Sequence, residues 1–293
     1  MVKLLDGKIP AKEILTQIKE EITVIKEQGI LPGLVTILVG NNLSSHLYVS
    51  HKQKACTKVG IYNQIYYLPD NSKQENVIQL ISNMNKDPQF HGILIQLPLP
   101  PQLDEDSILT EIDPAKDVDG LTPTISGTLL SPTPPRLAPA TPLAVLCLLD
   151  CYKYDVKGQH VVIVGASRIV GKPLAMMLIQ KGATVTICHD QTKDLPSFTR
   201  QADILISATG HPKLIKRDMI KEGSVIIDVG ITRIADYSRP NRYRIEGDVD
   251  FVDVKEKVFA ITPVPGGIGP LTVALLLQNL IHLIQFQIGR KTC

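Results

Sequence analysis

The 293-residue chain carries 31 lysine and arginine residues against 29 aspartate and glutamate residues, so its formal charges nearly cancel. No run of basic residues stands out, so the sequence lacks the electrostatic signature of a nucleic-acid-binding protein, and a small-molecule ligand fits better. A chain of this length exceeds the usual size of one compact core, so we expect two domains.

The five cysteines, at positions 56, 147, 151, 188 and 293, form no CxxC pair and no cluster with histidine. We therefore expect reduced thiols and no metal site. Cys147 and Cys151 lie four residues apart in an apolar run, where core packing is expected. The N-terminus lacks a long apolar segment, and the most apolar stretch, LTVALLLQNLIHLI, is short and interrupted by polar residues. We therefore expect a cytoplasmic protein with no membrane partner.

Helical and extended patterns alternate through the first half of the chain. Isoleucine and leucine residues repeat at helical spacing over 11–29, and a short apolar segment follows at 34–40. The alternation then predicts a helix at 45–58, a strand at 61–68, a helix at 73–85 and a strand at 92–97. Repeated βα units predict a mostly parallel sheet.

The segment SPTPPRLAPATP, at 131–142, contains five prolines and predicts a domain boundary. A second α/β block follows, with predicted strands at 160–165, 183–189, 203–209 and 224–230. This order is typical of a Rossmann-type fold.

The predicted fold is therefore α/β with two domains and an active site in the cleft between them. An N-terminal α/β substrate domain covers 1–142, and a C-terminal Rossmann-type dinucleotide-binding domain covers 143–270. A last helix, predicted at about 271–287, has apolar faces suited to packing back onto the first domain, so we assign 271–293 to that domain.

The first strand of the second block runs into GASRIVGKP, in which Gly165 and Gly171 bracket a loop that enters a helix. Such a loop directs backbone N–H groups at a phosphate, and its place in the block favours a pyrophosphate site over a purely structural turn. The second strand ends near Asp190, whose carboxylate would accept hydrogen bonds from a free ribose 2′-hydroxyl and so favour NAD. A solvated turn residue is the rival interpretation of Asp190. Arg168 would instead meet a 2′-phosphate, so these two residues argue in opposite directions.

Candidate site residues also occur in the first domain. Tyr48 and Lys52 lie four residues apart and share one face of a predicted helix, although such a pair is usually a packed ring beside a solvated charge. Gln96 ends a predicted strand just before prolines that expose its carboxyl end, where ligands collect in open α/β sheets. Asp117 and Asp119 lie in a glycine-containing turn, where a structural role competes with function, and we favour function only for Asp119.

Five motifs occur in order along the chain: S-x-x-Y-x-x-x-K at 45–52, GILIQLPLP at 92–100, KDVDG at 116–120, GASRIVGKP at 165–173 and TPVPGGIGPLT at 262–272. The last is rigid at its prolines and open at its glycines, so its backbone can approach a flat ligand. Together the motifs closely resemble the bifunctional methylenetetrahydrofolate dehydrogenase/cyclohydrolase (FolD) family. The resemblance implies hydride transfer from 5,10-methylenetetrahydrofolate to a nicotinamide cofactor, then hydrolysis of the methenyl product to 10-formyltetrahydrofolate. It also implies a homodimer.

Carried over by position, the resemblance implies that Lys52 is essential to hydrolysis, that Gln96 orients it, that Tyr48 stacks on the folate ring and that Asp119 holds the pterin. Hydrolysis needs a base or proton relay near neutrality, so the pKa of the amine must be lowered from about 10.4, or the amine must act through a water. The implied substrate contacts also include Ile95, Leu97, Pro263, Pro265, Gly266 and Gly267. The implied cofactor contacts are Gly165, Ala166, Ser167, Arg168, Asp190, Gly210 and Ile231.

At the cofactor site the chain departs from part of the family. Many members carry arginine at the position of Ala166, or a basic or hydroxyl residue at that of Asp190, and both help to hold a 2′-phosphate. NADP is the commoner family cofactor, whereas these two residues favour NAD.

Two other functions stay open at this stage. A dehydrogenase of another small substrate would keep the nucleotide-binding block, but the set of Tyr48, Lys52, Gln96 and Asp119 argues against it. A non-catalytic nucleotide-binding regulator would have no use for an amine such as Lys52, yet one sequence does not exclude it.

Overall fold

The computed structural model describes residues 2–131, 135, 137–238 and 243–291. The chain divides into two compact units. Unit 1 consists of Met1–Ala11 and Thr141–Thr272, and unit 2 consists of Lys12–Ala140 and Val273–Cys293.

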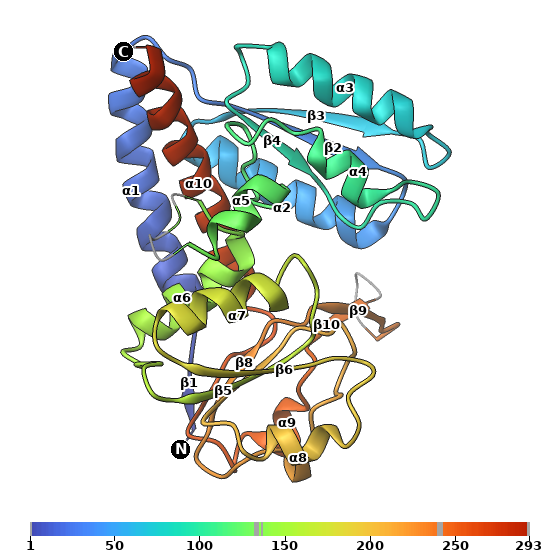
Figure 1. The fold of residues 1–293 in the computed structure, drawn as a ribbon, viewed down its shortest axis with the longest axis vertical. Coiled ribbons are helices and arrows are strands. Elements are labelled where there is room, and N and C mark those ends of the chain that lie inside the picture. Colours follow the sequence, from blue (N-terminus) through green and yellow to red (C-terminus); the bar gives the residue numbers. More distant parts are fainter. Residues whose placement is uncertain (1, 132–134, 136, 239–242, 292–293) are drawn as a thin grey trace. The chain divides into compact units, whose positions relative to one another are not determined.

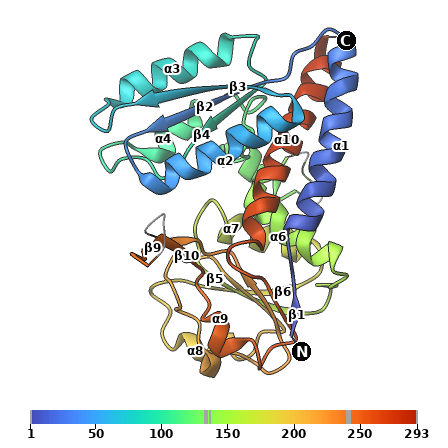
Figure 2. The same ribbon diagram turned by 180° about the vertical axis from the view of Figure 1, so that it is seen from behind.

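Unit 2 is built on a three-stranded parallel sheet in the order β3-β2-β4. Its strands are β2 (Gly33–Val39), β3 (Tyr62–Leu68) and β4 (Gly92–Ile95). The connecting helices α2 (Leu43–Val59) and α3 (Gln74–Lys86) cover opposite faces of the sheet (Figure 1 and Figure 2). Right-handed crossovers require this arrangement, because β3 and β4 lie on opposite sides of β2. The carboxyl ends of the three strands therefore meet at one edge of the sheet.

Two short helices follow this sheet in the chain, α4 (Glu105–Thr110) and α5 (Pro123–Thr128). The side chain of Asp104 accepts backbone N–H groups of the first turn of α4, and the hydroxyl of Thr122 does the same for α5. These caps satisfy donors that a helix start leaves unpaired, so helices of six residues are held at both places.

Two long helices, α1 (Lys8–Glu27) and α10 (Ile268–Lys291), pack side by side (Figure 1 and Figure 2). One apolar cluster of unit 2 joins Ile18 and Ile22 of α1 to Leu276, Leu280 and Ile284 of α10. Among the residues that the structure describes, α10 alone is long and apolar enough to cross a membrane by length and composition. However, 56% of its apolar window is buried inside the protein, and a core helix passes the same test.

Unit 1 contains a six-stranded parallel sheet in the order β1-β11-β8-β7-β5-β6. Its strands are β1 (Lys3–Leu4), β5 (His160–Val164), β6 (Thr184–Cys188), β7 (Ile204–Ser207), β8 (Val225–Asp228) and β11 (Ala260–Ile261). One face is covered by α6 (Ala140–Cys151) and α7 (Gly171–Gln180), and the other by α8 (Leu195–Thr199) and α9 (Phe251–Val254) (Figure 1). Helices on both faces explain why the central strands are buried along their whole length.

The structure differs from the sequence analysis at the ends of the predicted domains. The first eleven residues belong to unit 1, because β1 pairs with β11 through bonds such as Leu5 N–H to the Ile261 carbonyl at 3.0 Å. Two-residue strands are too short to show a period, so this pairing could not be predicted from the sequence. The predicted boundary at 131–142 overlaps α6, which begins at Ala140, and residues 132–134 and 136 lie outside the described residues. The antiparallel pair β9 (Thr232–Ala235) and β10 (Tyr243–Glu246) was not predicted either.

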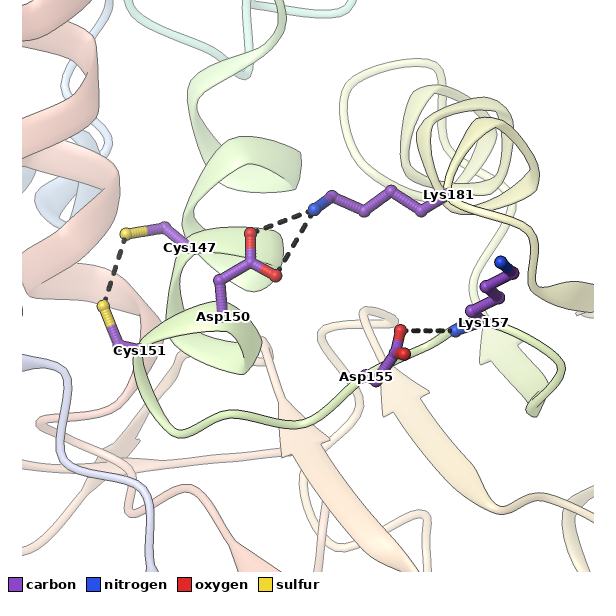
Figure 3. A network of polar contacts seen from close by, with 6 residues as sticks. All are labelled: Cys147, Asp150, Cys151, Asp155, Lys157 and Lys181. Atoms are coloured by element: carbon purple, nitrogen blue, oxygen red, sulfur yellow. Dashed lines mark hydrogen bonds and ion pairs between the residues drawn. The ribbon is translucent and has the colours of Figure 1, made fainter.

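Four cysteines of the described residues are free thiols, and Cys293 lies outside those residues. The sulfur atoms of Cys147 and Cys151 are 4.0 Å apart on one face of α6 (Figure 3). Cys151 is exposed, so the expectation of core packing is wrong for this residue, which ends the helix. On the same helix Asp150 forms an ion pair with Lys181 at 3.0 Å (Figure 3). Both of these side chains are well exposed, so the pair contributes less than about 1 kcal/mol.

The buried amide of Asn279 on α10 gives a test of how this helix is anchored. Its Nδ2 donates to the carbonyl of Val118 at 3.1 Å and to that of Ala138 at 3.0 Å. We expect Asn279→Ala to lower the free energy of unfolding by about 2–3 kcal/mol, because both carbonyls lose their donor in a dry environment. Urea unfolding measures this loss. Gln285→Ala, on the exposed side of α10, is the control and should change it by less than about 0.5 kcal/mol. Equal effects of the two substitutions would contradict the anchoring role.

Candidate functional site

A row of buried side chains on α2 faces the interior of unit 2. The helix begins after Asn42, whose Oδ1 accepts the backbone N–H of Ser45 at 3.0 Å. Ser45, Val49, Lys52 and Cys56 follow at spacings of three and four residues and so share the inner face. The cap therefore fixes the start of the helix that carries an amine into the interior.

The amine of Lys52 is held by Gln96 inside unit 2. Each of these residues is only 8% exposed, and Lys52 Nζ donates to Gln96 Oε1 at 3.1 Å. The Nε2 of Gln96 donates to the carbonyl of Leu97 at 2.8 Å, which leaves Oε1 facing the amine. The backbone N–H of Gln96 donates to the carbonyl of Ile37 at 2.9 Å, so the sheet fixes the position of this residue. The structure thus places Gln96 directly after β4, within hydrogen-bond distance of Lys52.

The two aspartates of the KDVDG turn have different surroundings. Asp117 is buried, and its carboxylate accepts the backbone N–H of Gly120 at 2.9 Å and that of Thr122 at 2.7 Å. It therefore holds the turn together. Asp119 is partly buried and interacts electrostatically with Lys52. We call Lys52, Gln96 and Asp119 the Lys52 cluster.

Burial shifts the protonation of this cluster toward neutral forms. It lowers the pKa of Lys52, while the charge of Asp119 and, less strongly, that of Cys56 act in the opposite direction. Burial likewise raises the pKa of Asp119, which Lys52 opposes. Burial also raises the pKa of Tyr48 to about 12, so this phenol is neutral at physiological pH. An amine displaced toward its neutral form can accept a proton near neutrality.

The hydroxyl of Ser45 lies on the same face of α2. It is 1% exposed, and its Oγ has no hydrogen-bond partner among the described residues. Buried polar atoms normally have partners, so this oxygen is available to a ligand.

A pocket of about 540 Å³ lies in unit 1 at the carboxyl ends of β5, β6 and β7. The order of the sheet reverses between β5 and β7, and ligands of open α/β sheets bind at such a switch point. The pocket is lined by Val164, Gly165, Ala166, Ser167, His189, Asp190, Thr192, Leu195, Ala208, Thr209, His211 and Leu214.

The loop between β5 and α7 lies tightly against the chain around it. Gly165 has a φ of +115°, and a Cβ on it would lie 2.3 Å from the carbonyl oxygen of Ala208. A Cβ on Gly171 would lie 1.9 Å from the carbonyl oxygen of Gly165. Both positions therefore require glycine, and the backbone between them is open to a phosphate in the pocket.

The carboxylate of Asp190 is in contact with solvent at the pocket. Its side chain is 85% exposed, and its Oδ2 accepts the side-chain N–H of Gln191 at 3.1 Å. That hydrogen bond holds the pKa of Asp190 below its usual value. The residue is therefore ionised at neutral pH and can accept a hydrogen bond from a ribose hydroxyl.

The pocket brings together four of the predicted cofactor residues, Gly165, Ala166, Ser167 and Asp190. Gly210 lies between two lining residues, and its carbonyl accepts the hydroxyl of Thr232 at 3.0 Å. Arg168 and Ile231 are not among the lining residues.

Several lining residues were not predicted from the sequence, among them Thr192, Thr209 and His211. They follow the carboxyl ends of β6 and β7, so the rule that ligands bind at this edge of a parallel sheet was the available signal. Cys56, one turn beyond Lys52, was not predicted either, although its helical spacing from Lys52 was an available signal.

The PVPGGIGP loop belongs to unit 1 and leads from β11 into the first turn of α10, which begins at Ile268. Gly267 N–H donates to the carbonyl of Pro263 at 2.8 Å, and Gly7 N–H donates to that of Gly266 at 2.9 Å. The peptide bond before Pro265 is cis. The predicted substrate contacts are thus divided, with these loop residues in unit 1 and the Lys52 cluster in unit 2.

Unit 1 has the architecture and the loop of a nucleotide-binding α/β domain, and unit 2 holds a buried amine at the ligand-binding edge of a second parallel sheet. This combination defines the class of two-domain, nucleotide-dependent α/β enzymes.

The comparisons with known proteins specify the family. Residues 5–119 match the tetrahydrofolate dehydrogenase/cyclohydrolase catalytic domain, and residues 139–288 match the NAD(P)-binding domain of the same family. The bifunctional protein FolD of Aquifex aeolicus is 49% identical over 280 residues, which cover 95% of this chain and 94% of that protein.

Two solved structures are similar over nearly their whole length. The bifunctional enzyme FolD of Campylobacter jejuni has a TM-score of 0.92 and 44% identity, covering 98% of this chain and 100% of that one. The Trypanosoma brucei FolD, complexed with NADP cofactor and inhibitor, has a TM-score of 0.94 and 38% identity, covering 98% of each chain.

The chain belongs to the tetrahydrofolate dehydrogenase/cyclohydrolase family. It is a bifunctional methylenetetrahydrofolate dehydrogenase and methenyltetrahydrofolate cyclohydrolase, and the α/β fold with two domains and the family resemblance are confirmed.

The opposing effects of burial and charge on Lys52 give a second test. Asp119→Asn removes a negative charge that favours the ammonium form, so we expect the pKa of Lys52 to fall further below its value in the unmodified protein. An NMR titration, with the Lys52 signal assigned by comparison with Lys52→Met, measures this change. Glu75→Gln removes an exposed carboxylate from α3 and should leave the Lys52 titration unchanged. An unchanged or higher pKa in Asp119→Asn would show that the two groups do not interact.

Proposed function

We propose that the hydrolytic step depends on the Lys52 amine and that hydride transfer depends on positioning of the cofactor by the unit 1 pocket. The observation that carries this division is the burial of Lys52, whose amine is held by Gln96 at 3.1 Å and has a lowered pKa. In this proposal unit 2 is the folate-binding domain, including the C-terminal helix, and unit 1 is the dinucleotide-binding domain.

The hydrolytic step uses the neutral amine as a base. Water attacks the cationic methenyl carbon of the substrate while Lys52 takes one of its protons, which gives a neutral carbinolamine. The bond between this carbon and N5 then breaks, and the oxygen becomes the formyl oxygen on N10. Of the two protons of water, one ends on N5 and the other is released. A cationic substrate beside Lys52 disfavours the ammonium form further, so the amine is ready to accept a proton at this step.

The remaining residues of unit 2 orient the substrate. The carboxylate of Asp119 accepts hydrogen bonds from N–H groups of the pterin, and the neutral ring of Tyr48 stacks on the folate. Gln96 fixes the direction of the Lys52 amine, because the side-chain amide of Gln96 is itself held by the carbonyl of Leu97. Ile95 and Leu97 flank Gln96 at the end of β4 and supply apolar contacts. From unit 1, the PVPGGIGP loop supplies backbone contacts through Pro263, Pro265, Gly266 and Gly267.

The residues of the unit 1 pocket fit an NAD(P) cofactor, because the backbone of Gly165, Ala166 and Ser167 borders a cavity of about 540 Å³ that also receives Asp190. A nicotinamide held there would supply the acceptor for the hydride of the methylene carbon. The chain's contribution is to hold pyrophosphate at the glycine loop and ribose at Asp190, with Arg168, Gly210 and Ile231 as further contacts.

The choice of cofactor follows from charge. An ionised Asp190 accepts hydrogen bonds from a 2′-hydroxyl and repels a 2′-phosphate, and Ala166 offers no positive charge to such a phosphate. These two residues favour NAD, although NADP is the more common cofactor of the family.

The family resemblance also supports a cytoplasmic homodimer that supplies one-carbon units to purine biosynthesis. Analytical ultracentrifugation of the purified chain tests the oligomeric state, and a monomer at micromolar concentration would contradict this part of the proposal.

The reaction itself is tested by following methenyl absorbance with methylenetetrahydrofolate and either NAD or NADP. We expect the absorbance to rise and then decay in the unmodified enzyme. In Lys52→Met it should accumulate, because hydrolysis loses its base and slows by about 100-fold or more while hydride transfer remains measurable. Lys54→Met, on the exposed side of α2, is the matched control and should behave as the unmodified enzyme. Failure of the unmodified enzyme to turn over with either cofactor would favour a dehydrogenase of another substrate or a non-catalytic regulator. Undiminished hydrolysis in Lys52→Met would refute the role of Lys52 as the base.

Cofactor choice is tested by Asp190→Ser. Removal of the carboxylate should shift the ratio of kcat/KM for NADP to that for NAD by about tenfold in favour of NADP, because the repulsion of a 2′-phosphate is lost. Asp155→Ser removes an exposed carboxylate that does not line the nucleotide pocket and serves as the control. An unchanged ratio in Asp190→Ser would mean that this acid does not meet the ribose.

A further inference from the structure

Two buried aspartates, Asp228 and Asp248, lie at the carboxyl edge of the unit 1 sheet. Asp228 ends β8 and is 3% exposed, and Asp248 follows β10 and is fully buried. Each carboxyl group packs against the glycine of the other's segment. A Cβ on Gly230 would lie 2.0 Å from Asp248 Oδ1, and a Cβ on Gly247 would lie 2.0 Å from Asp228 Oδ2. The two segments are therefore interlocked, with glycine required at both contact points.

Asp228 binds the two segments together through backbone N–H groups. Its Oδ1 accepts from Gly230 and from Asp248, each at 3.0 Å, and its Oδ2 accepts from Val249 at 2.9 Å. Its own backbone N–H donates to Thr262 Oγ1 at 2.7 Å. Asp228 thus links the end of β8 with the segment after β10 and with the start of the PVPGGIGP loop.

Asp248 extends this network to the nucleotide pocket. Its Oδ2 accepts the backbone N–H of Thr209 at 2.6 Å and the hydroxyl of Ser207 at 3.0 Å. Thr209 lines the pocket and precedes Gly210, one of the proposed cofactor contacts. The other oxygen, Oδ1, is buried with no hydrogen-bond partner among the described residues. One carboxylate oxygen of Asp248 therefore holds the loop after β7 in place.

Two carboxyl groups buried side by side are costly, and the cost is visible in the protonation of Asp228. Burial raises the pKa of Asp228 to about 7, with a further contribution from the charge of Asp248. Apolar side chains would fill the same space without this cost, but they could not accept the N–H groups of the loops that frame the pocket.

We propose that Asp248 is a positioning residue for the nucleotide. It fixes the loop from Ala208 to His211 through Thr209, and its contact with Gly230 and Asp228 fixes the segment that leads to Ile231. The inference rests on the proposed function of the pocket, because it assumes that the ligand bound there is a dinucleotide.

The test compares nucleotide binding with the nucleotide-independent reaction. Asp248→Asn keeps the shape and one acceptor oxygen but loses the charge, so we expect the Kd for NAD(H), measured by calorimetry without folate, to rise by about tenfold. Hydrolysis of methenyltetrahydrofolate without nucleotide should stay within about twofold, because it depends on the Lys52 cluster in unit 2. Asp203→Asn is the matched control, since Asp203 pairs with Lys221 at the opposite edge of the same sheet, and it should leave the Kd unchanged.

A second variant keeps the test decisive if Asp248→Asn does not fold. Ser207→Ala removes one of the two donors to the same carboxylate oxygen and should raise the Kd by about threefold, again without slowing hydrolysis. An unchanged Kd in folded Asp248→Asn, or in Ser207→Ala where Asp248→Asn does not fold, would overturn the proposal. A parallel loss of hydrolysis and of urea resistance would also overturn it, because it would show a general structural role. The Kd is measured without turnover, so it is independent of the two reactions. An unmodified chain that binds NAD(H) but catalyses neither reaction would refute the proposed function, and the effect of Asp248→Asn on the Kd would still test the role of Asp248.

Discussion

The burial of one lysine amine is the constraint around which unit 2 is arranged. An ammonium group removed from water is costly unless it is partnered, and Lys52 has Gln96 as a hydrogen-bond partner and Asp119 as a charge partner. Each partner is placed by backbone structure, since Gln96 directly follows β4 and Asp119 lies in the turn that Asp117 holds. The small sheet gathers these segments at one edge because its three strands are parallel. The same arrangement offsets part of the cost of burying the amine. It also shifts the amine toward its neutral form, which can accept a proton.

Unit 1 also gathers its loops at the carboxyl edge of a parallel sheet, here around the nucleotide pocket. Its parallel strands bring the loops after β5, β6 and β7 to one edge, where glycines let the backbone approach closely. These loops lack regular pairing of their own, so side chains must hold them. Asp248 does so for the loop after β7, and Asp228 holds the segments after β8 and β10. The requirement for glycine at positions 230 and 247 follows from the space that the two carboxyl groups occupy. The loop after β7 is therefore held by side chains that do not line the pocket.

The sequence was informative where the signal is local and uninformative where it depends on distant pairing. Helical spacing predicted the common face of Tyr48 and Lys52, and the strand ends near Gln96 and Asp190 followed from apolar runs and turn residues. The pairing of β1 with β11 could not be predicted, because two residues show no period and their partner lies more than 250 residues away. Asp228 ends an apolar run and Asp248 follows a glycine, as many solvated turn residues do, so only the fold shows that they are buried.

The depth of Lys52 and of Asp190 matches the protonation state that the role proposed for each residue needs. Lys52 is 8% exposed, and a proton acceptor must spend time in its neutral form, which burial favours for an amine. The side chain of Asp190 is 85% exposed, and a hydrogen-bond acceptor for ribose must stay ionised, which exposure favours for an acid. If Asp190 were as deep as Asp228, its pKa would rise and the carboxylate would lose both its charge and its discrimination against a 2′-phosphate. Both proposed sites lie at the carboxyl edge of a parallel sheet. They suit different chemistry because the depth of the side chain at that edge determines whether it is charged.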